Sequence, residues 1–369
     1  MRAPIHRGRA LAAVIASLAL VCGTAAPAAA QPVRDRQWHL TALKVGKAHE
    51  VTRGASVTVA VIDSGIDAKH QDLAGAVLPG KDFFDPGGDG RVDVDGHGTA
   101  MTGIIAGRGH GEDRGILGIA PAAKILPVRV PLNMPSGGKV LADAITYAAG
   151  HGARVINMSL GSNDEALIHE AIRAAQAADI VLVASSGNRG EIEGDYPAKY
   201  PEVLAVGAVD RAGKIAKFSI TGPQVDIAAP GVDIASTDIG ETGYSVSYGT
   251  SHATAVVSGA AALIRARYPE LSAADVVHRL TATAVDAGKP GRDDVYGHGR
   301  LDLVKALTAD VPAAPPTATP SASVRPGPVE VPSASAGSRR VSPILLTSGL
   351  AAVVLILGGA VVALMLRRR

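Results

Sequence analysis

The sequence predicts an α/β fold in which a mostly parallel sheet is covered by helices on both faces. Short apolar runs of strand length alternate with longer runs, rich in small residues, that have the length of helices. Polar residues and turn-forming glycines follow several of the strand-length runs, which places candidate functional groups at the carboxyl edge of the sheet.

The strands are predicted from uninterrupted apolar runs. The first, 57–62, ends at Asp63, and the Ser-Gly after it turns the chain. Another is Ile180-Val-Leu-Val-Ala184, which ends in the turn Ser185-Ser-Gly-Asn188. Further strands are predicted at 124–130, 155–158 and 203–209.

The helices lie between and after these strands. Two of them, 97–106 and 251–266, consist of apolar and small residues and begin with His97 and Ser251. Each of these residues is therefore expected at a helix N-terminus, where backbone N–H groups lack partners within the helix. Further helices are predicted at 139–149, 165–177 and 273–282, and the sequence contains no internal repeat.

Three short segments carry an aspartate, a histidine and a serine in the pattern of a nucleophilic triad. They are Val59-Ala-Val-Ile-Asp63-Ser-Gly, Asp95-Gly-His97-Gly-Thr and Gly249-Thr-Ser251-His-Ala-Thr. A serine hydroxyl needs a base within hydrogen-bond reach, and the base needs a partner that fixes its tautomer. We expect Ser251 to attack, His97 to move the proton and Asp63 to orient His97.

Asn188 fits the same chemistry as an oxyanion-hole donor beside the backbone N–H of Ser251. Taken singly, an Asp after a strand or a Ser before a helix is ordinary turn or capping chemistry. The order, the spacing and the presence of Asn188 together favour catalysis over that simpler interpretation.

These segments resemble those of the subtilisin-like serine proteases, or subtilases, over about 37–307. The resemblance also includes Gly118-Ile-Ala-Pro121, Asn157-Met-Ser-Leu-Gly161, Ala228-Ala-Pro-Gly231 and Gly297-His-Gly-Arg-Leu-Asp302. It implies a three-layer subtilisin-like fold, a triad of Asp63, His97 and Ser251, and an oxyanion hole of Asn188 and Ser251. It also implies that two segments line the substrate channel, the first by pairing with substrate backbone: Ser159, Leu160 and Gly161, then Ala184, Ser185, Ser186 and Gly187.

Two residues near the nucleophile depart from the family pattern. His252 and Ala255 stand where subtilases usually carry methionine and proline. Alanine suits a helix interior, so the helix is still expected. His252 is interpreted as filling the place of the methionine, with titration near the site as the alternative.

The N-terminal residues 1–30 are predicted to be a secretory signal peptide. Arg2, Arg7 and Arg9 precede an apolar stretch, and Ala28-Ala-Ala30 offers a small-residue cleavage site. The alternative, a membrane anchor, is disfavoured because roughly 12 apolar residues are too few to span a bilayer. Cys22 is the only cysteine and lies in this segment, so no disulfide is expected in the exported chain.

The C-terminal end is predicted to anchor the protein to a membrane. Residues 344–366 carry no charge, and the transmembrane helix is placed at 343–366, before the basic tail 367–369. That tail is expected in the cytoplasm and the catalytic domain outside. The segment 311–342, in which 19 of 32 residues are Pro, Ala or Ser, is predicted to be a disordered stalk. Residues 31–310 then form one protease domain.

Charge and composition exclude some partners and leave others open. Without the arginines of both ends the exported portion is mildly acidic and has no basic stripe, so nucleic acid is excluded. No cofactor is expected. The loop 82–95 contains five aspartates and three glycines, which suits either Ca²⁺ or, as the more common alternative, a solvated surface loop.

The loop Gly87-Gly-Asp-Gly, the stalk and the C-terminal anchor together resemble the mycosins, which are membrane-anchored subtilases of actinobacteria associated with type VII secretion. The resemblance also implies a short N-terminal extension that wraps the domain. Mycosins usually have a cysteine in this loop, where this chain has Val94. Two functions stay open: an endopeptidase that processes exported proteins, and a mainly structural component of a type VII secretion assembly.

Overall fold

Seven parallel strands form the centre of the computed structural model, which describes residues 32–111, 114–132, 138–190 and 196–312. The strands are arranged in the order β2-β5-β1-β6-β7-β8-β9. Their bounds are β1 Thr58–Asp63, β2 Lys81–Asp82, β5 Lys124–Arg129, β6 Val155–Met158, β7 Val181–Ser185, β8 Leu204–Val209 and β9 Val225–Pro230. The predicted parallel sheet is therefore present.

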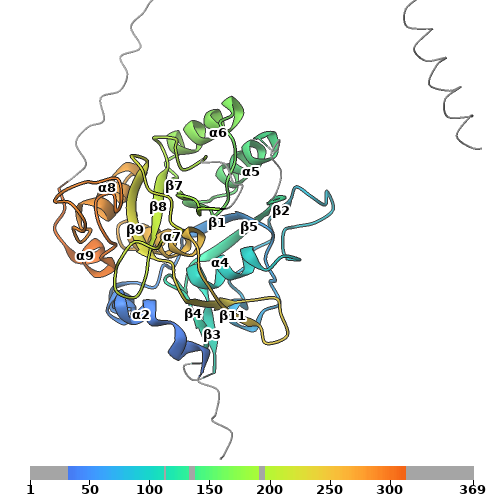
Figure 1. Ribbon diagram of the computed structural model, residues 1–369. Helices are drawn as coiled ribbons and strands as arrows, with labels where there is room; N and C mark the ends of the chain where they lie inside the picture. Colours follow the sequence, from blue (N-terminus) through green and yellow to red (C-terminus); the bar gives the residue numbers. More distant parts are fainter. Residues whose placement is uncertain (1–31, 112–113, 133–137, 191–195, 313–369) are drawn as a thin grey trace, which may run out of the picture. The chain divides into compact units, whose positions relative to one another are not determined.

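Helices cover both faces of this sheet and give three layers (Figure 1). Alternate residues of β1 point to opposite sides: Val59 and Val61 belong to one buried cluster, and Ala60 and Ile62 to the other. The first cluster includes residues of α4 and α7, and the second includes residues of α5 and α6. Their bounds are α4 His97–Ala106, α5 Gly138–Gly150, α6 Ala166–Ala177 and α7 Thr250–Arg267.

The predicted strands and helices are present, and their ends differ from the observed ends by no more than one residue. The helix at 97–106, the strand at 155–158 and the helix at 273–282, which is α8 Ala273–Ala282, agree with the structure at both ends. The sequence interpretation missed β9 and the short elements around the site. These are the hairpin strands β3 Arg108–His110, β4 Arg114–Leu117, β10 Ile234–Thr237 and β11 Tyr244–Ser247, the turn η2 Gln71–Leu73 and the helix α9 Leu303–Thr308.

An N-terminal segment packs against the domain ahead of β1. It consists of η1 Val33–Arg36, α2 Trp38–Ala42 and α3 Val45–Val51. The buried Gln37 side chain donates to the carbonyl of Leu117 and accepts from its N–H, both at 2.9 Å. The Trp38 indole N–H donates to the carbonyl of Val232 at 3.0 Å. The segment is thus part of the folded domain.

Both edges of the sheet are short or covered. At one edge, β2 has only two residues. At the other, the C-terminal segment pairs with β9: Ala228 N–H donates to Gly299 and Leu301 N–H donates to Ala228, both at 2.9 Å.

Several predicted segments lie outside the described residues. They are the signal peptide 1–30, all but the first two residues of the stalk 311–342, the transmembrane helix 343–366 and the tail 367–369. Within the described part, none of the helices combines the length and apolar character needed to cross a membrane.

Candidate active site

Asp63 and His97 meet at the carboxyl edge of the sheet. Asp63 is the last residue of β1 and has no exposed surface. Its Oδ1 and Oδ2 lie 2.8 and 3.0 Å from Nδ1 of His97, the first residue of α4. A buried carboxylate at this position favours the tautomer with the proton on Nδ1, which leaves Nε2 to act as the base.

The turn that leads into α4 is held by the carboxylate of Asp93. Oδ1 accepts from the Ser64 hydroxyl at 2.9 Å and from the N–H of Gly96 at 3.0 Å. Oδ2 accepts from both the N–H and the hydroxyl of Thr99, at 3.0 and 2.7 Å. Ser64 in turn accepts the N–H of Gly98 at 3.0 Å. These bonds join the residue after Asp63 to the residues around His97.

Ser251 lies in the first turn of α7 and is 8% exposed. The turn before it is fixed by the Gly249 N–H, which donates to the carbonyl of Gly231 at 2.9 Å. The Ser251 hydroxyl donates to the carbonyl of Ser159 over 3.4 Å, a long bond that constrains its rotation weakly. α4 and α7 pack against each other, and His97 is close enough to His252, the residue after Ser251, for its charge to lower the pKa of His252.

A chain of hydrogen-bonded polar side chains connects the interior of α7 to the backbone of Ser251. Ser258, two turns along α7, donates to Oδ1 of Asn157 at 2.9 Å. The Asn157 Nδ2 donates to the hydroxyl of Ser159 at 3.1 Å, and that hydroxyl donates to the carbonyl of Ser251 at 3.1 Å. Asn157 and Ser258 have no exposed surface, so each bond replaces one that water would otherwise make.

Asn188 reaches the same helix start from the turn after β7. Its Oδ1 accepts the N–H and the hydroxyl of Thr250, at 3.0 and 3.1 Å. With the oxygen committed as acceptor, the amide nitrogen is the group turned toward the site. It lies 3.6 Å from the position that a Cβ would occupy on Gly249. The Asn188 amide therefore lies near the turn before Ser251, and its role as an oxyanion donor stays a prediction.

His252, next to the nucleophile, is buried with a second histidine, His39 of α2. Neither ring nitrogen of either residue finds a hydrogen-bond partner among the described residues. Burial, with smaller effects of positive charge on His97 and His39, lowers the pKa of His252 to about 3, and burial lowers that of His39 to about 4. Both rings are therefore neutral at pH 7, as expected if His252 fills an apolar place. The neighbouring departure, Ala255, is buried within α7, and the helix is continuous there.

The residues predicted to line the substrate channel follow β6 and β7. Neither Leu160 nor Gly161 makes a backbone–backbone hydrogen bond within the described part of the chain, so this segment is open to pairing. Of the second group, Ala184 has no exposed surface and packs in the core. Ser185 and Ser186 are also buried, whereas Gly187 is partly exposed and adopts a φ of 95°.

Two carboxylates of the acidic loop 82–95, Asp82 and Asp93, accept hydrogen bonds from other groups of the protein. Asp82 Oδ1 accepts the N–H groups of Phe84 and Asp85, both at 2.7 Å, and Oδ2 pairs with Arg129 at 2.8 Å. Asp93 is surrounded by the donors described above. Within the described residues no three His, Cys, Asp or Glu side chains form a group that could hold a metal ion. The donors around Asp82 and Asp93 do not suit a cation, and calcium binding by this loop stays a sequence-based prediction.

The sequence interpretation assigned no role to Asn157, Ser258, Ser64 or Asp93. One signal was present: Asn157 and Ser258 are polar residues within otherwise apolar runs. Such residues usually have a buried hydrogen-bond partner. The sequence does not say which partner, because that depends on how β6 and α7 pack.

Comparisons with known proteins agree with this geometry. The family model described as "Subtilase family" matches residues 54–299. Mycosin-1 of Mycobacterium tuberculosis is 37% identical over 360 residues, covering 80% of this chain and 79% of that protein. Subtilisin DY of Bacillus licheniformis is 39% identical over 261 residues, covering 69% of this chain and 92% of that protein.

A solved structure is also similar. It is described as that of a serine protease MycP1, an essential component of the type VII (ESX-1) secretion system. The TM-score is 0.67 at 34% identity, and the match covers 76% of this chain and 90% of that one.

Proposed function

The chain belongs to the subtilase family of serine proteases and is similar to the mycosins within it, and on that premise we propose that it is a membrane-anchored endopeptidase that processes exported proteins. The observation that carries the proposed chemistry is the fully buried Asp63 carboxylate bonded to Nδ1 of His97, at the edge of the sheet where Ser251 begins a neighbouring helix.

In the proposed mechanism, Ser251 Oγ attacks the carbonyl carbon of the substrate while His97 Nε2 accepts the hydroxyl proton. Asp63 holds the ring and stabilises the imidazolium that forms. His97 then gives the proton to the leaving amine, which leaves an acyl-enzyme on Ser251. Water attacks that ester with His97 again as the base, and the serine is regenerated.

The negative charge that develops on the substrate oxygen would be stabilised by two donors. One is the Asn188 amide, oriented by its bonds to Thr250. The other is the backbone N–H of Ser251, which lies in the first turn of α7 where such groups have no partner within the helix. Because both proposed donors belong to the folded domain, little reorganisation would be needed as charge appears.

We propose that substrate backbone pairs with Ser159–Gly161 as an added strand. A small hollow of about 30 Å³ lies beside this segment and is lined by Leu160, Gly161, Ser162, Val130, Pro131, Leu132, Val140 and Leu141. Because it has room for about one water, an apolar substrate side chain upstream of the cleaved bond would pack against its leucine and valine side chains rather than enter it.

The proposed location rests on the sequence and on the relatives. The charge-free run 344–366 before three arginines supports a single-pass anchor with a cytoplasmic C-terminus. If the anchor and stalk are as proposed, external protease applied to intact cells should cut within 311–342 and release a soluble domain. Recovery of uncut protein until the cells are lysed would contradict that topology or indicate a partner that shields the stalk.

A structural role in a type VII secretion assembly is the second candidate. The relative MycP1 is described both as a protease and as an essential component of such a system, which supports a comparable partner here. In the two-role case, a Ser251→Ala protein would lose hydrolysis yet still support secretion in a strain that lacks the wild-type protein.

The activity test compares the purified full-length protein with its Ser251→Ala variant on a peptide library and with a serine-directed organophosphonate. We expect cleavage of apolar-containing peptides and labelling of Ser251 in the wild-type protein alone. Folded wild-type protein that neither cleaves nor labels would favour the structural role.

A further inference from the structure

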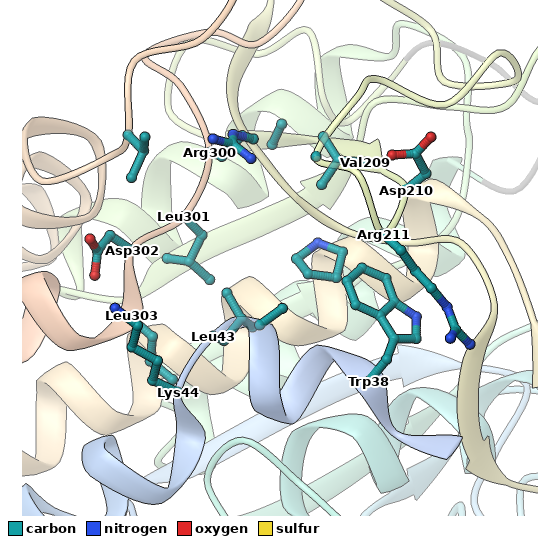
Figure 2. Close-up of a pocket in the computed structure, with 15 residues that line it drawn as sticks. Trp38, Leu43, Lys44, Val209, Asp210, Arg211, Arg300, Leu301, Asp302 and Leu303 are labelled. Atoms are coloured by element: carbon teal, nitrogen blue, oxygen red, sulfur yellow. The ribbon is translucent and has the colours of Figure 1, made fainter. Parts of the chain in front are cut away.

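A cavity of about 240 Å³ lies outside the site described above, between the N-terminal segment and the C-terminal end of the domain (Figure 2). Trp38, Leu43 and Lys44 line it from one side. Arg300 to Leu303 line it from another, and the end of β8 with Pro230 closes it. None of the three triad residues contributes to its walls.

The wall of this cavity combines apolar and polar surface in similar amounts. Leu43, Val209, Pro230 and Leu301 are buried residues whose side chains face it, and Trp38 adds an aromatic surface that is partly exposed. The volume lies below the roughly 300–1,000 Å³ of pockets that hold drug-sized ligands. It therefore suits an apolar group about as large as one amino-acid residue.

Three cationic side chains line the cavity, and none of them forms an ion pair with a described carboxylate. They are Lys44, Arg211 and Arg300. Arg211 lies over the Trp38 ring, with the guanidinium carbon 5.7 Å from the ring centre. Arg300 lines the cavity, and its guanidinium makes no hydrogen bond to a described residue. Its Nε has essentially no accessible surface, so the terminal nitrogens are the donors that a ligand in the cavity can reach.

The two acidic residues at the cavity already have partners. Asp210 Oδ1 accepts the N–H groups of Ala212 and Lys214, at 2.9 and 3.0 Å. Asp302 Oδ1 accepts the N–H of Lys305 at 3.0 Å, and its Oδ2 lies 3.7 Å from the Lys305 ammonium. Three cations and two carboxylates line the cavity, so its net charge is positive.

We propose that this cavity binds a carboxylate carried by an apolar group of one-residue size, such as the C-terminal residue of a polypeptide or a small carboxylic acid. The apolar group packs against Trp38 and Leu43, and the carboxylate accepts from a terminal nitrogen of Arg300, with Lys44 as a second cation on the cavity wall. Charge-assisted bonds of this kind are stronger than neutral ones.

The single tryptophan of the chain gives a direct measurement, because Trp38 is that residue and lines the cavity. Full-length protein carrying Ser251→Ala, which cannot cleave a peptide, is titrated with N-acetyl-leucine and separately with N-acetyl-leucinamide. We expect a saturable change in tryptophan fluorescence with the acid, and affinity lower by about tenfold or more for the amide, which lacks the charge.

Two substitutions and one matched control test the assignment of the cations. Arg300→Gln should weaken N-acetyl-leucine binding by about tenfold or more, and Lys44→Gln, at an exposed side chain, should weaken it less. Arg36→Gln removes an exposed arginine of the same N-terminal segment that does not line the cavity, and should bind as the parent does. Circular dichroism checks that each variant is folded, and Lys44→Gln keeps the test valid if Arg300→Gln is not.

The proposal is overturned by an absent fluorescence change up to millimolar acid, by equal affinity for acid and amide, or by unchanged affinity in the folded cation variants. Octapeptides ending in leucine, with a free or an amidated C-terminus, identify the source of the carboxylate. A free-acid peptide that binds about tenfold tighter than N-acetyl-leucine assigns the cavity to polypeptide C-termini, and equal affinity assigns it to small acids.

Discussion

The starts of α4 and α7 carry His97 and Ser251 of the proposed triad, and the two side chains differ in how closely hydrogen bonds hold them. The His97 ring is bonded to the buried Asp63, while Asp93 and Ser64 bind the turn around it. Beside Ser251 lie two buried histidines, His252 and His39, whose ring nitrogens make no hydrogen bond to described residues.

This difference follows from what each residue must do. A base has to be held in one tautomer and orientation, which directional hydrogen bonds achieve. The nucleophile needs only to be placed, with freedom for its hydroxyl to rotate between partners. Dense packing around α7 and hydrogen bonds at Thr250 and the Ser251 carbonyl place Ser251, while its hydroxyl makes one long bond that leaves it free to rotate. Activity should therefore fall when a single acceptor around His97 is removed. Stability should change when the buried histidines beside Ser251 become protonated.

The largest expected effect comes from the hydrogen bonds around His97. Asp63→Asn should lower kcat by about 10,000-fold, because an amide in place of the carboxylate stabilises the wrong His97 tautomer. Steady-state hydrolysis of a peptide found in the library screen measures this. Asp89→Asn changes a partly exposed carboxylate of the nearby loop and should leave kcat unaltered. A loss below tenfold in Asp63→Asn would mean that the Asp63–His97 bond does not control catalysis.

Next in size is Asn188, which connects the two regions through its bonds to Thr250. Asn188→Ala should lower kcat by about 100- to 1,000-fold with little change in KM, because the donor acts on charge present only in the transition state. Asn188→Asp retains an acceptor for the Thr250 N–H but has no N–H donor, and should lose at least as much. If Asn188→Asp instead keeps wild-type kcat, the residue serves to fix Thr250.

Asp93→Ala tests whether the turn into α4 depends on one carboxylate. We expect the free energy of unfolding to fall by about 1–3 kcal/mol, because donors around Asp93 lose their acceptor. Chemical denaturation measures the change, and kcat should fall as His97 is held less firmly. Asp89→Ala, which removes an exposed ion pair with Arg91, should cost less than about 0.5 kcal/mol. Equal costs for both would show that Asp93 is an ordinary surface residue.

The buried histidine beside Ser251 should make the stability of the fold depend on pH. The folded-state pKa of His252 lies below its unfolded value of 6.5, so the unfolded chain takes up a proton that the folded chain does not as pH falls through 6.5. Between pH 7 and pH 5 this should cost about 2 kcal/mol of stability. The loss continues until pH approaches the folded-state value of about 3.

His252→Met should remove that contribution and make the fall in stability between pH 7 and pH 5 shallower by about 2 kcal/mol. His39→Leu is the parallel variant on the other ring, whose pKa is lowered to about 4. Denaturation curves at both pH values provide the measurement. An unchanged pH slope in both variants would show that the two rings are already hydrated or paired in solution.

The sequence was most informative where a local signal and the fold agree. Uninterrupted apolar runs predicted the central strands, because a parallel sheet buried on both faces requires them. The edge strand β9 was missed because its run is broken by Asp226 and ends at Pro230. The hairpins were missed because their short strands contain polar residues or glycine and form no uninterrupted apolar run.

The site divides in the same way. Asp63, His97, Ser251 and Asn188 stand in recognisable segments at strand ends and helix starts, so their positions follow from the fold. Asn157 and Asp93 act through partners 101 and 6 residues away, Ser258 and Thr99. Such pairings depend on how helices and turns pack, which apolar periodicity does not encode. The burial of His252 likewise depends on packing with His39, which lies in a segment more than 200 residues earlier.

The short strand β2 and the segment paired with β9 affect how the protein behaves at high concentration. A long free edge offers unpaired N–H and C=O groups to any extended chain, and copies of one protein can then join edge to edge into aggregates. Here one edge has two residues and the other is occupied by the chain's own backbone around Ala228. An enzyme proposed to hold extended polypeptides by strand addition would thus confine that pairing to its cleft and resist self-polymerisation.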